Sequence, residues 1–251
     1  MTQKDLFRIS HENGVVELRL NRGPVNALSA EFLIDFADLI DDLSRDSSVR
    51  AIVLTSEFKV LSAGLDLKEA QDFDIAAQNA IVKGLNVGFL SLFACPRPVV
   101  VAINGAAIAG GLFFVLASDL RLSGQKAKFG LAEVRVGADF PVGPLEIARA
   151  TLTPDARRYL MLTGLPISAE RARQLGIVDD IIADDQLREE ALARAADLAG
   201  LPPLTFASIK SQLRRNTIET IEAAIASGGN APDGGWFSSE TKAAMKRMIG
   251  N

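Results

Sequence analysis

Two glycine-bearing turns stand where an apolar, strand-like run leads towards a helix-like run. The first covers residues 61–67 and reads Leu-Ser-Ala-Gly-Leu-Asp-Leu, and the second covers residues 104–111 and reads Asn-Gly-Ala-Ala-Ile-Ala-Gly-Gly. Glycine lets the backbone approach a neighbour closely, and the first N–H groups of a helix have no partner inside it. Each turn can therefore present a peptide N–H to an oxygen atom, although small residues also serve tight turns alone.

Other kinds of chemistry lack the residues they need. Cys95 is the only cysteine and His11 the only histidine, so we expect no internal disulfide, no zinc centre and no metal site. Cys95 precedes a proline, and we expect it to be buried packing because no second histidine could activate it. His11 lies in a predicted hairpin turn, where we expect it to be exposed and inert.

The charge balance and the apolar runs exclude two classes of partner. Lys and Arg total 27 against 31 for Asp and Glu, a net charge of -4, which is the wrong sign for gripping phosphate backbones. Aromatic residues make up 6% of the chain, which argues against base-stacking platforms. The amino terminus has no signal-like apolar region, and no apolar run reaches the length of a membrane span. We expect no nucleic-acid partner, no membrane association and a cytoplasmic location.

The pattern of apolar residues predicts the elements that carry the two turns. Residues 6–20 alternate polar and apolar side chains around a turn, as in a hairpin, and Ser29 is a good N-cap for a helix to residue 43. Short β runs at 51–54, 99–103, 120–122 and near 129 alternate with helical stretches, which predicts an α/β first half. From residue 153 we expect almost only helix, over 154–162, 169–175, 186–199, 203–226 and, after a glycine-rich loop, 239–248.

Together with their neighbours, the two turns resemble the crotonase (enoyl-CoA hydratase/isomerase) superfamily. The resemblance also covers Asn-Arg-Gly-Pro-Val-Asn-Ala-Leu at 21–28, Phe-Gly-Leu-Ala-Glu-Val-Arg-Val-Gly at 129–137, residues 169–179 and Phe-Ser-Ser-Glu at 237–240. It implies an α/β fold, a spiral of ββα units over residues 1–195, with a C-terminal helical trimerisation region over 196–251. The implied assembly is a homotrimer, often paired into a hexamer.

The resemblance also implies an acyl-CoA substrate whose thioester oxygen lies between two backbone N–H groups. By position these donors are Leu65 and Gly110, and the dipole of a helix expected over 111–117 would favour the same negative charge. Because coenzyme A is part of the substrate, no separate cofactor is implied.

For the coenzyme A portion, the resemblance points to the backbone around four residues of the first half and to two side chains near the carboxyl end. Lys246 is equally expected on the solvated face of a helix, without any contact to a phosphate. The expected residues are Ala27, Ala63, Asp66 and Leu67, with Phe237 and Lys246 near the adenine or its phosphates.

The proton-transfer group separates the reactions of this superfamily. Its hydratases use two glutamates, one in the helix after the second turn and one in the following loop. Glu133 falls at the second position and Phe113 at the first. Hydration needs two proton-transfer groups, whereas moving a double bond from position 3 to position 2 needs one base. The chain therefore resembles the Δ3,Δ2-enoyl-CoA isomerases of fatty-acid breakdown, and an apolar surround would raise the pKa of Glu133.

Several alternatives stay open. Without the resemblance, Glu133 would be interpreted as a solvent-facing loop carboxylate, and Phe113 as a core residue rather than a wall of the acyl pocket. Asp139 or Glu146 could supply a second acid, although Pro141 stands where related dienoyl-CoA isomerases carry an extra aspartate. The competing functions are a hydratase or other crotonase reaction, and a catalytically silent acyl-CoA-binding oligomer.

Overall fold

Alternating polar and apolar residues at the start of the chain form a hairpin that opens the larger of two sheets. The computed structural model describes residues 5–250. Strand β1 runs antiparallel to β2, and every later pair in this sheet is parallel. The order in the larger sheet is β1 (Leu6–Ser10), β2 (Val15–Leu20), β3 (Ala51–Ser56), β4 (Val99–Ile103), β6 (Leu120–Gly124) and β9 (Asp180–Ile182). The smaller sheet contains β5 (Ala106–Ile108), β7 (Lys128–Gly130) and β8 (Ile167–Ser168).

Several helices begin at a side chain that accepts a hydrogen bond from a free backbone N–H group of the first turn. The predicted cap Ser29 accepts from the N–H of Phe32 at the start of α1, and Asp74 caps α3 in the same way. The helices are α1 (Ala30–Arg45), α2 (Leu67–Ala70), α3 (Ile75–Ala94), α4 (Leu112–Leu116), α5 (Glu133–Val136), α6 (Val142–Thr151), α7 (Pro154–Thr163), α8 (Ala169–Gln174), α9 (Leu187–Ala199), α10 (Pro203–Ala224) and α11 (Thr241–Ile249).

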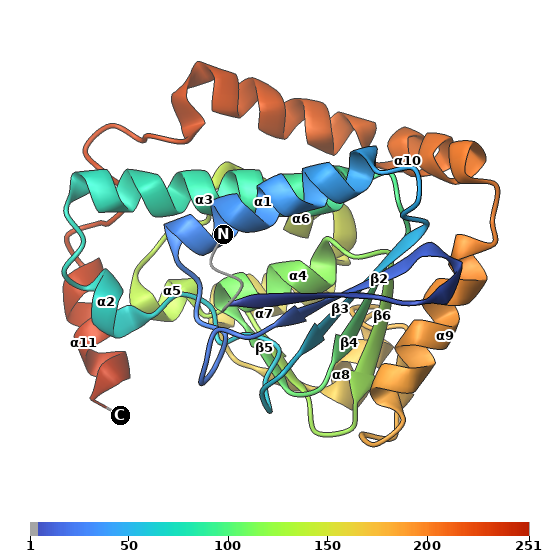
Figure 1. Cartoon of the computed structure of the whole chain (residues 1–251). Coiled ribbons are helices and arrows are strands. Elements are labelled where there is room, and N and C mark those ends of the chain that lie inside the picture. The colour runs from blue at the N-terminus through green and yellow to red at the C-terminus, as the bar shows by residue number, and fades with distance from the viewer. Residues whose placement is uncertain (1–4, 251) are drawn as a thin grey trace.

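Helices cover both faces of the larger sheet (Figure 1). Helix α9 lies on one face, where Ala191 and Ala195 pack against Val53 and Val100. Helices α1, α3 and α4 lie on the other face, in a core rich in phenylalanine. Strand β4 is buried along its whole length, as its uninterrupted apolar run predicted. The expected α/β class is confirmed.

The structure departs from the sequence predictions in several local features. The second half is almost all helix, as expected, but the short strands β8 and β9 also join the two sheets. Helix α6 was not among the predicted helices, and it carries Pro144 in its first turn, where proline is tolerated. The second glycine turn contains strand β5 before its helix. Glu133 is not in a loop but is the first residue of α5.

The C-terminal region packs on the core through long polar side chains as well as apolar ones. Lys210 and Arg214 of α10 reach the carboxylate of Asp119, with N···O distances of 2.6 and 2.8 Å. The predicted boundary at residue 195 lies inside α9, which continues to Ala199, so the division into 1–195 and 196–251 stays a prediction. No helix among the described residues is long and apolar enough to cross a membrane.

Candidate active site

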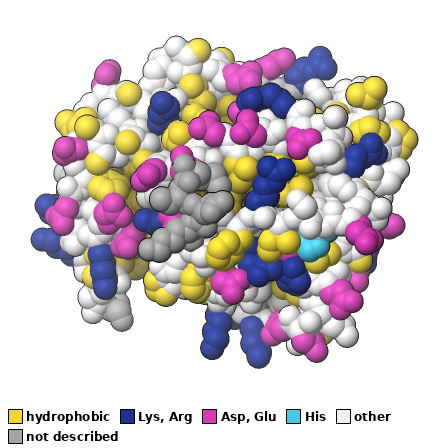
Figure 2. All heavy atoms as spheres, in the orientation of Figure 1, with side chains coloured by type: hydrophobic (Ala, Val, Ile, Leu, Met, Phe, Trp, Pro, Cys, Tyr) yellow, Lys and Arg dark blue, Asp and Glu magenta, His cyan; other side chains and the backbone are white. Residues whose placement is uncertain are grey.

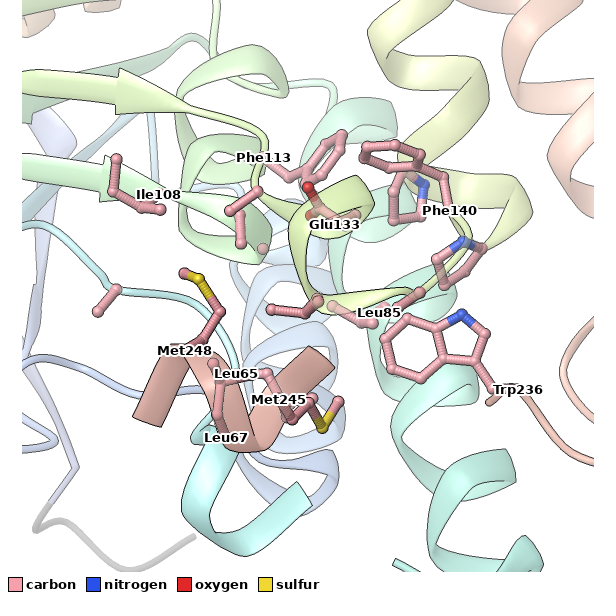
Figure 3. Close-up of a pocket in the computed structure, with 18 residues that line it drawn as sticks. Leu65, Leu67, Leu85, Ile108, Phe113, Glu133, Phe140, Trp236, Met245 and Met248 are labelled. Atoms are coloured by element: carbon pink, nitrogen blue, oxygen red, sulfur yellow. The ribbon is translucent and has the colours of Figure 1, made fainter. Parts of the chain in front are cut away.

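The two glycine turns border an apolar cavity of about 150 Å³. Figure 3 shows its lining, which comes from segments far apart in the sequence. Among the described residues that line the cavity, Glu133 is the one with an ionisable side chain. The others are Ala63, Leu65, Leu67, Leu85, Ile108, Ala109, Gly110, Phe113, Ala132, Val136, Ala138, Phe140, Pro141, Pro144, Trp236, Met245 and Met248.

The two turns meet at Gly64, where a side chain would not fit. Gly64 has a φ of +80°, and a Cβ there would lie 2.9 Å from the carbonyl oxygen of Ile108 and 3.1 Å from the nitrogen of Gly110. Ala109 adopts a φ of +49°, a left-handed conformation that is strained for alanine. This conformation fixes the direction of the next peptide, whose N–H is the predicted donor Gly110. Contact between the turns brings the predicted donors Leu65 and Gly110 to the same cavity.

Both of these N–H groups are free to bind a ligand oxygen. In residues 5–250, neither the N–H of Leu65 nor that of Gly110 is used in a backbone hydrogen bond of the loops and turns. Neighbouring backbone groups, in contrast, hold the turns in place: the N–H of Ile108 donates to the Ser62 carbonyl at 3.0 Å and joins the two turns, and the N–H of Leu28 donates to the Gly64 carbonyl at 2.9 Å and anchors the first. The turns are therefore held rigidly while two donors remain available, as electrostatic stabilisation of an oxyanion requires.

Two buried polar residues outside the predicted set support the first turn. The side chain of Asn26 donates to the Leu61 carbonyl at 2.9 Å and to Ser56 Oγ at 2.8 Å. The hydroxyl of Ser62 donates to the Asn26 carbonyl at 2.7 Å and accepts from the N–H of Gly64 at 3.2 Å. Both side chains are 2% exposed or less, so their bonds are protected from water.

Glu133 is buried at the centre of the cavity wall. Glu133 is 8% exposed, and its side-chain atom Oε2 has no hydrogen-bond partner. Burial raises the pKa of the Glu133 carboxyl from 4.5 to about 8. Phe113, which is 1% exposed, and Phe140 lie beside it with their rings in an edge-to-face arrangement at 6.4 Å (Figure 3). The carboxyl is poised to exchange a proton near neutral pH with a ligand in the cavity.

The structure brings six of the ten predicted site residues together around the cavity. The predicted proton carrier and both predicted N–H donors are among them, and Phe113 is at once a core residue and part of the wall. The six are Glu133, Leu65, Gly110, Phe113, Ala63 and Leu67.

The other four lie outside the cavity lining. Ala27 accepts a hydrogen bond from Arg22 through its carbonyl oxygen, and the carboxylate of Asp66 caps α2 by accepting from the N–H of Lys68 at 2.9 Å. Phe237 stacks on the ring of Phe73, with centroids 6.4 Å apart. Lys246 is exposed on α11. Their predicted contacts with coenzyme A stay predictions.

The two alternative acids are not among the residues that line the cavity. Asp139 is exposed and uses its backbone carbonyl to accept from the indole N–H of Trp236 at 2.9 Å. Glu146 pairs with Arg149 one turn further along α6, at 2.5 Å. Neither lines the cavity beside Glu133.

Much of the far wall of the cavity was not predicted from the sequence. Phe140 precedes a helix that was not expected, and Trp236, Met245 and Met248 reach the cavity from the C-terminal segment. The amphipathic pattern of the last helix was the available signal for the two methionines, since an apolar face must pack on something. Trp236 is the only tryptophan of the chain and follows a glycine-rich loop.

His11 was expected to be exposed and inert; its side chain is 28% exposed, only partly as expected, and its inertness stays a prediction. Figure 2 shows this histidine at the surface, beside basic side chains. Its Nε2 lies 3.0 Å from Oε2 of Glu17, a buried carboxylate of β2 that also accepts two hydrogen bonds from Arg188. Cys95 is 2% exposed, so the expectation that it is buried is confirmed.

Within the part of the chain that the structure describes, no cluster of metal ligands borders the cavity. In residues 5–250, no group of three or more His, Cys, Asp or Glu side chains is placed to hold a metal ion. The arrangement offers instead one buried acid, two backbone N–H donors and an apolar chamber. A carbonyl compound with an apolar tail fits this combination.

Comparison with known proteins identifies the family. A family model described as enoyl-CoA hydratase/isomerase matches residues 10–230. The chain belongs to the enoyl-CoA hydratase/isomerase family. This confirms the resemblance to the crotonase superfamily.

Relatives within the enoyl-CoA hydratase/isomerase family carry different reaction names. A putative enoyl-CoA hydratase of Thermus thermophilus is 34% identical over 191 residues, which are 75% of each chain. A (7aS)-7a-methyl-1,5-dioxo-2,3,5,6,7,7a-hexahydro-1H-indene-carboxyl-CoA hydrolase of Mycobacterium tuberculosis is 29% identical over 213 residues, 84% of this chain and 85% of the relative. A solved Mycobacterium tuberculosis structure named as an enoyl-CoA isomerase matches with a TM-score of 0.82 at 26% identity, covering 90% of this chain and 100% of that chain. Another structure of the same protein is named as a probable enoyl-CoA hydratase. Family membership therefore fixes the fold and the acyl-CoA substrate class, while the site must decide the reaction.

Proposed function

We propose that the protein is a Δ3,Δ2-enoyl-CoA isomerase. The observation that carries the proposal is that Glu133 is the one ionisable side chain lining the apolar cavity, within the part of the chain that the structure describes. A double-bond shift needs one group that takes a proton and returns it, and a single carboxyl can do both. The pKa of about 8 suits that task, because the group exchanges protons readily near neutral pH.

The proposed reaction has two proton transfers on one side chain. The thioester carbonyl oxygen accepts hydrogen bonds from the N–H groups of Leu65 and Gly110. Ionised Glu133 removes a proton from C2, and the electron pair spreads over the oxygen, C2 and C4 as a dienolate. Glu133 then gives the proton to C4, which leaves the double bond between C2 and C3. The N–H groups are positioned before the charge forms, so they need no reorganisation as the charge develops.

Coenzyme A enters this proposal as part of the substrate, and no further cofactor is required. We place its pantetheine along Ala63 and Leu67, which line the cavity beside the Leu65 donor. A homotrimer or hexamer and a cytoplasmic location are part of the same proposal. The oligomeric state can be measured by light scattering at several protein concentrations.

The direct test gives purified protein a 3-enoyl-CoA and follows the conjugated thioester by absorbance. We expect turnover by the parent and a loss of at least about 100-fold in kcat for Glu133→Gln, which keeps the shape and removes the base. Glu219→Gln, an exposed carboxyl of α10, is the matched control and should retain the parent rate. No turnover by the parent, or full activity of Glu133→Gln, would reject the proposal.

Hydration is the second candidate, because the Thermus relative and a 28% identical relative from Escherichia coli are named as hydratases. Hydration would need a second polar group to position the water, and the place beside Glu133 is taken by Phe113. Rapid hydration of crotonyl-CoA, faster than isomerisation of a 3-enoyl-CoA, would favour this candidate. Tight binding of acyl-CoA thioesters without turnover of any would indicate a silent acyl-CoA-binding oligomer.

A further inference from the structure

A glycine-rich segment, residues 229–237, starts at the end of the short π-helical turn Ile225–Gly229 that follows α10 and runs to the cavity; we call it the strap. Gly234 and Gly235 both adopt a positive φ, of +77° and +89°, so the backbone turns sharply just before Trp236. The strap is joined to α3 at both ends by buried amide side chains. These side chains do not line the cavity themselves.

Gln78 of α3 holds the end of the strap that enters the cavity. Its Oε1 accepts hydrogen bonds from the N–H groups of Trp236 and Phe237, at 2.8 and 2.9 Å. Its Nε2 donates to the Phe73 carbonyl at 3.2 Å, which fixes the orientation of the amide. Gln78 is 9% exposed, and a Cβ on Gly235 would lie 2.6 Å from its Oε1. The close approach explains why a glycine precedes Trp236.

Asn86 holds the other end of the strap. It lies eight residues further along α3, about 12 Å along the helix axis. Its Nδ2 donates to Asn230 Oδ1 at 2.9 Å and to the Gly229 carbonyl at 3.3 Å, while its Oδ1 accepts from the N–H of Gly143 at 2.8 Å. Asn86 is fully buried. One side chain thus connects α3, the strap and the start of α6.

The strap places the indole of Trp236 in the cavity wall. Its ring N–H donates to the Asp139 carbonyl at 2.9 Å, so the side chain as well as the backbone is anchored. Figure 3 shows Trp236 and Phe140 on the side of the cavity away from Leu65 and Leu67. Since the Leu65 N–H is the proposed contact of the thioester oxygen, the acyl tail must extend from there past Glu133. The indole stands where a growing tail would end.

We propose that Trp236 terminates the acyl pocket and sets the length of acyl chain accepted, and that Gln78 is a positioning residue that holds it there. The inference rests on the acyl-CoA binding of the proposed function and goes on to name the substrate range. A cavity of about 150 Å³ is small beside the roughly 300–1,000 Å³ of sites for drug-sized ligands, so the structure selects short chains.

The test measures binding of saturated acyl-CoAs from butyryl-CoA to dodecanoyl-CoA, which bind without reacting. The dissociation constant should tighten by about fourfold per methylene while the chain still gains apolar contact, and stop tightening once the chain meets the indole. Calorimetry gives the constants. Because Trp236 is the only tryptophan, its fluorescence should change most for the chain length at which tightening stops.

Three variants test what sets the length limit, which is the chain length at which the dissociation constant stops tightening. Trp236→Ala should move the limit to longer chains. Gln78→Met keeps the size of the side chain but removes the acceptor, so it should move the limit in the same direction and shift the Trp236 emission. Gln78→Glu, measured at a pH low enough to keep it protonated, accepts from the two N–H groups and donates to the Phe73 carbonyl, so it should keep the parent limit. Gln125→Met, at an exposed position between β6 and β7, is the matched control and should leave both the length limit and the Trp236 emission unchanged.

The outcomes separate this inference from the proposed function. If Trp236→Ala keeps the parent limit, or if Gln78→Met lowers only the melting temperature while the limit and the emission stay unchanged, the inference is overturned. Binding that shows the length limit without isomerisation of a 3-enoyl-CoA would support the inference and reject the reaction. Absence of binding at every length would overturn both.

Discussion

Replacing Glu133 by glutamine should make the protein more stable while it removes the proposed base. The pKa of this carboxyl is 4.5 in its ordinary state and about 8 in the folded protein. Below pH 4.5 the carboxyl is protonated in both the folded and the unfolded chain, so its ionisation does not affect stability. Between pH 4.5 and 8 the unfolded chain loses the proton and the folded protein keeps it, which favours unfolding increasingly as the pH rises.

The size of this effect follows from the two pKa values. At about 1.4 kcal/mol per pKa unit, the stability lost by the parent reaches about 3 kcal/mol at pH 7 and levels off near 5 kcal/mol above pH 8. Glutamine resembles the protonated acid in shape and leaves the same buried polar atoms without partners. Glu133→Gln should therefore equal the parent near pH 4.5 and exceed its stability by about 3 kcal/mol at pH 7.

The assay is urea unfolding of parent and variant at one protein concentration, at pH values from 4.5 to 9, followed by the fluorescence of Trp236. Glu219→Gln serves as the exposed control, with an expected change below about 0.5 kcal/mol at every pH. A stability difference between Glu133→Gln and the parent that stays constant with pH would refute the reasoning. So would a variant that is less stable than the parent at pH 7, because burial of a titrating carboxyl could then not explain the difference.

Three further results are expected. In the isomerase assay, kcat/KM should rise about tenfold per pH unit below pH 8 and level off above it, because ionised Glu133 is the reactive form; a flat profile between pH 6 and 9 would contradict this. Gly64→Ala should cost about 1 kcal/mol of stability because of its positive φ, and should lower kcat/KM by about 100-fold because the added Cβ pushes the two turns apart. Gly176→Ala is the control: it also has a positive φ, but its Cβ would meet no atom within 4 Å, so kcat/KM should stay unchanged. Burial alone would raise the pKa of Glu17, but hydrogen bonds, the strongest from Arg188, lower it to about 2. Glu17→Gln should therefore be about 3 kcal/mol less stable than the parent at pH 7, and this difference should disappear as the pH falls from 4.5 towards 2. Equal acid unfolding curves of parent and variant would show that this carboxylate does not contribute to stability.

The two buried glutamates show how surroundings divide one residue type into two roles. Glu17 is surrounded by hydrogen-bond donors and stays ionised, so it stabilises the packing of the sheet against helix α9, which carries Arg188. Glu133 has an oxygen without a partner and an apolar surround, so the folded protein carries it at a cost in stability. Such a cost is typical of a group kept for chemistry rather than for stability.

The sequence alone determined the elements whose signals are local. The N-cap at Ser29, the buried run of β4 and the two glycine turns each depend on a few consecutive residues, and each was found where the pattern predicted it. Resemblance of the ordered motifs added the family, and with it the positions of Leu65, Gly110 and Glu133. Periodicity alone could not have distinguished Glu133 from an exposed carboxylate.

Only the tertiary structure decided how distant segments complete the site. Strands β8 and β9 are too short to show a pattern of their own and exist because neighbouring strands offer them hydrogen bonds. Trp236 lies in the cavity because Gln78, 158 positions away in the chain, accepts the N–H groups at the end of the strap. Burial of Glu133 likewise comes from residues of several elements, and the pKa depends on all of them at once. A linear sequence records each of these groups but not the distances between them, and desolvation and hydrogen bonding depend on those distances.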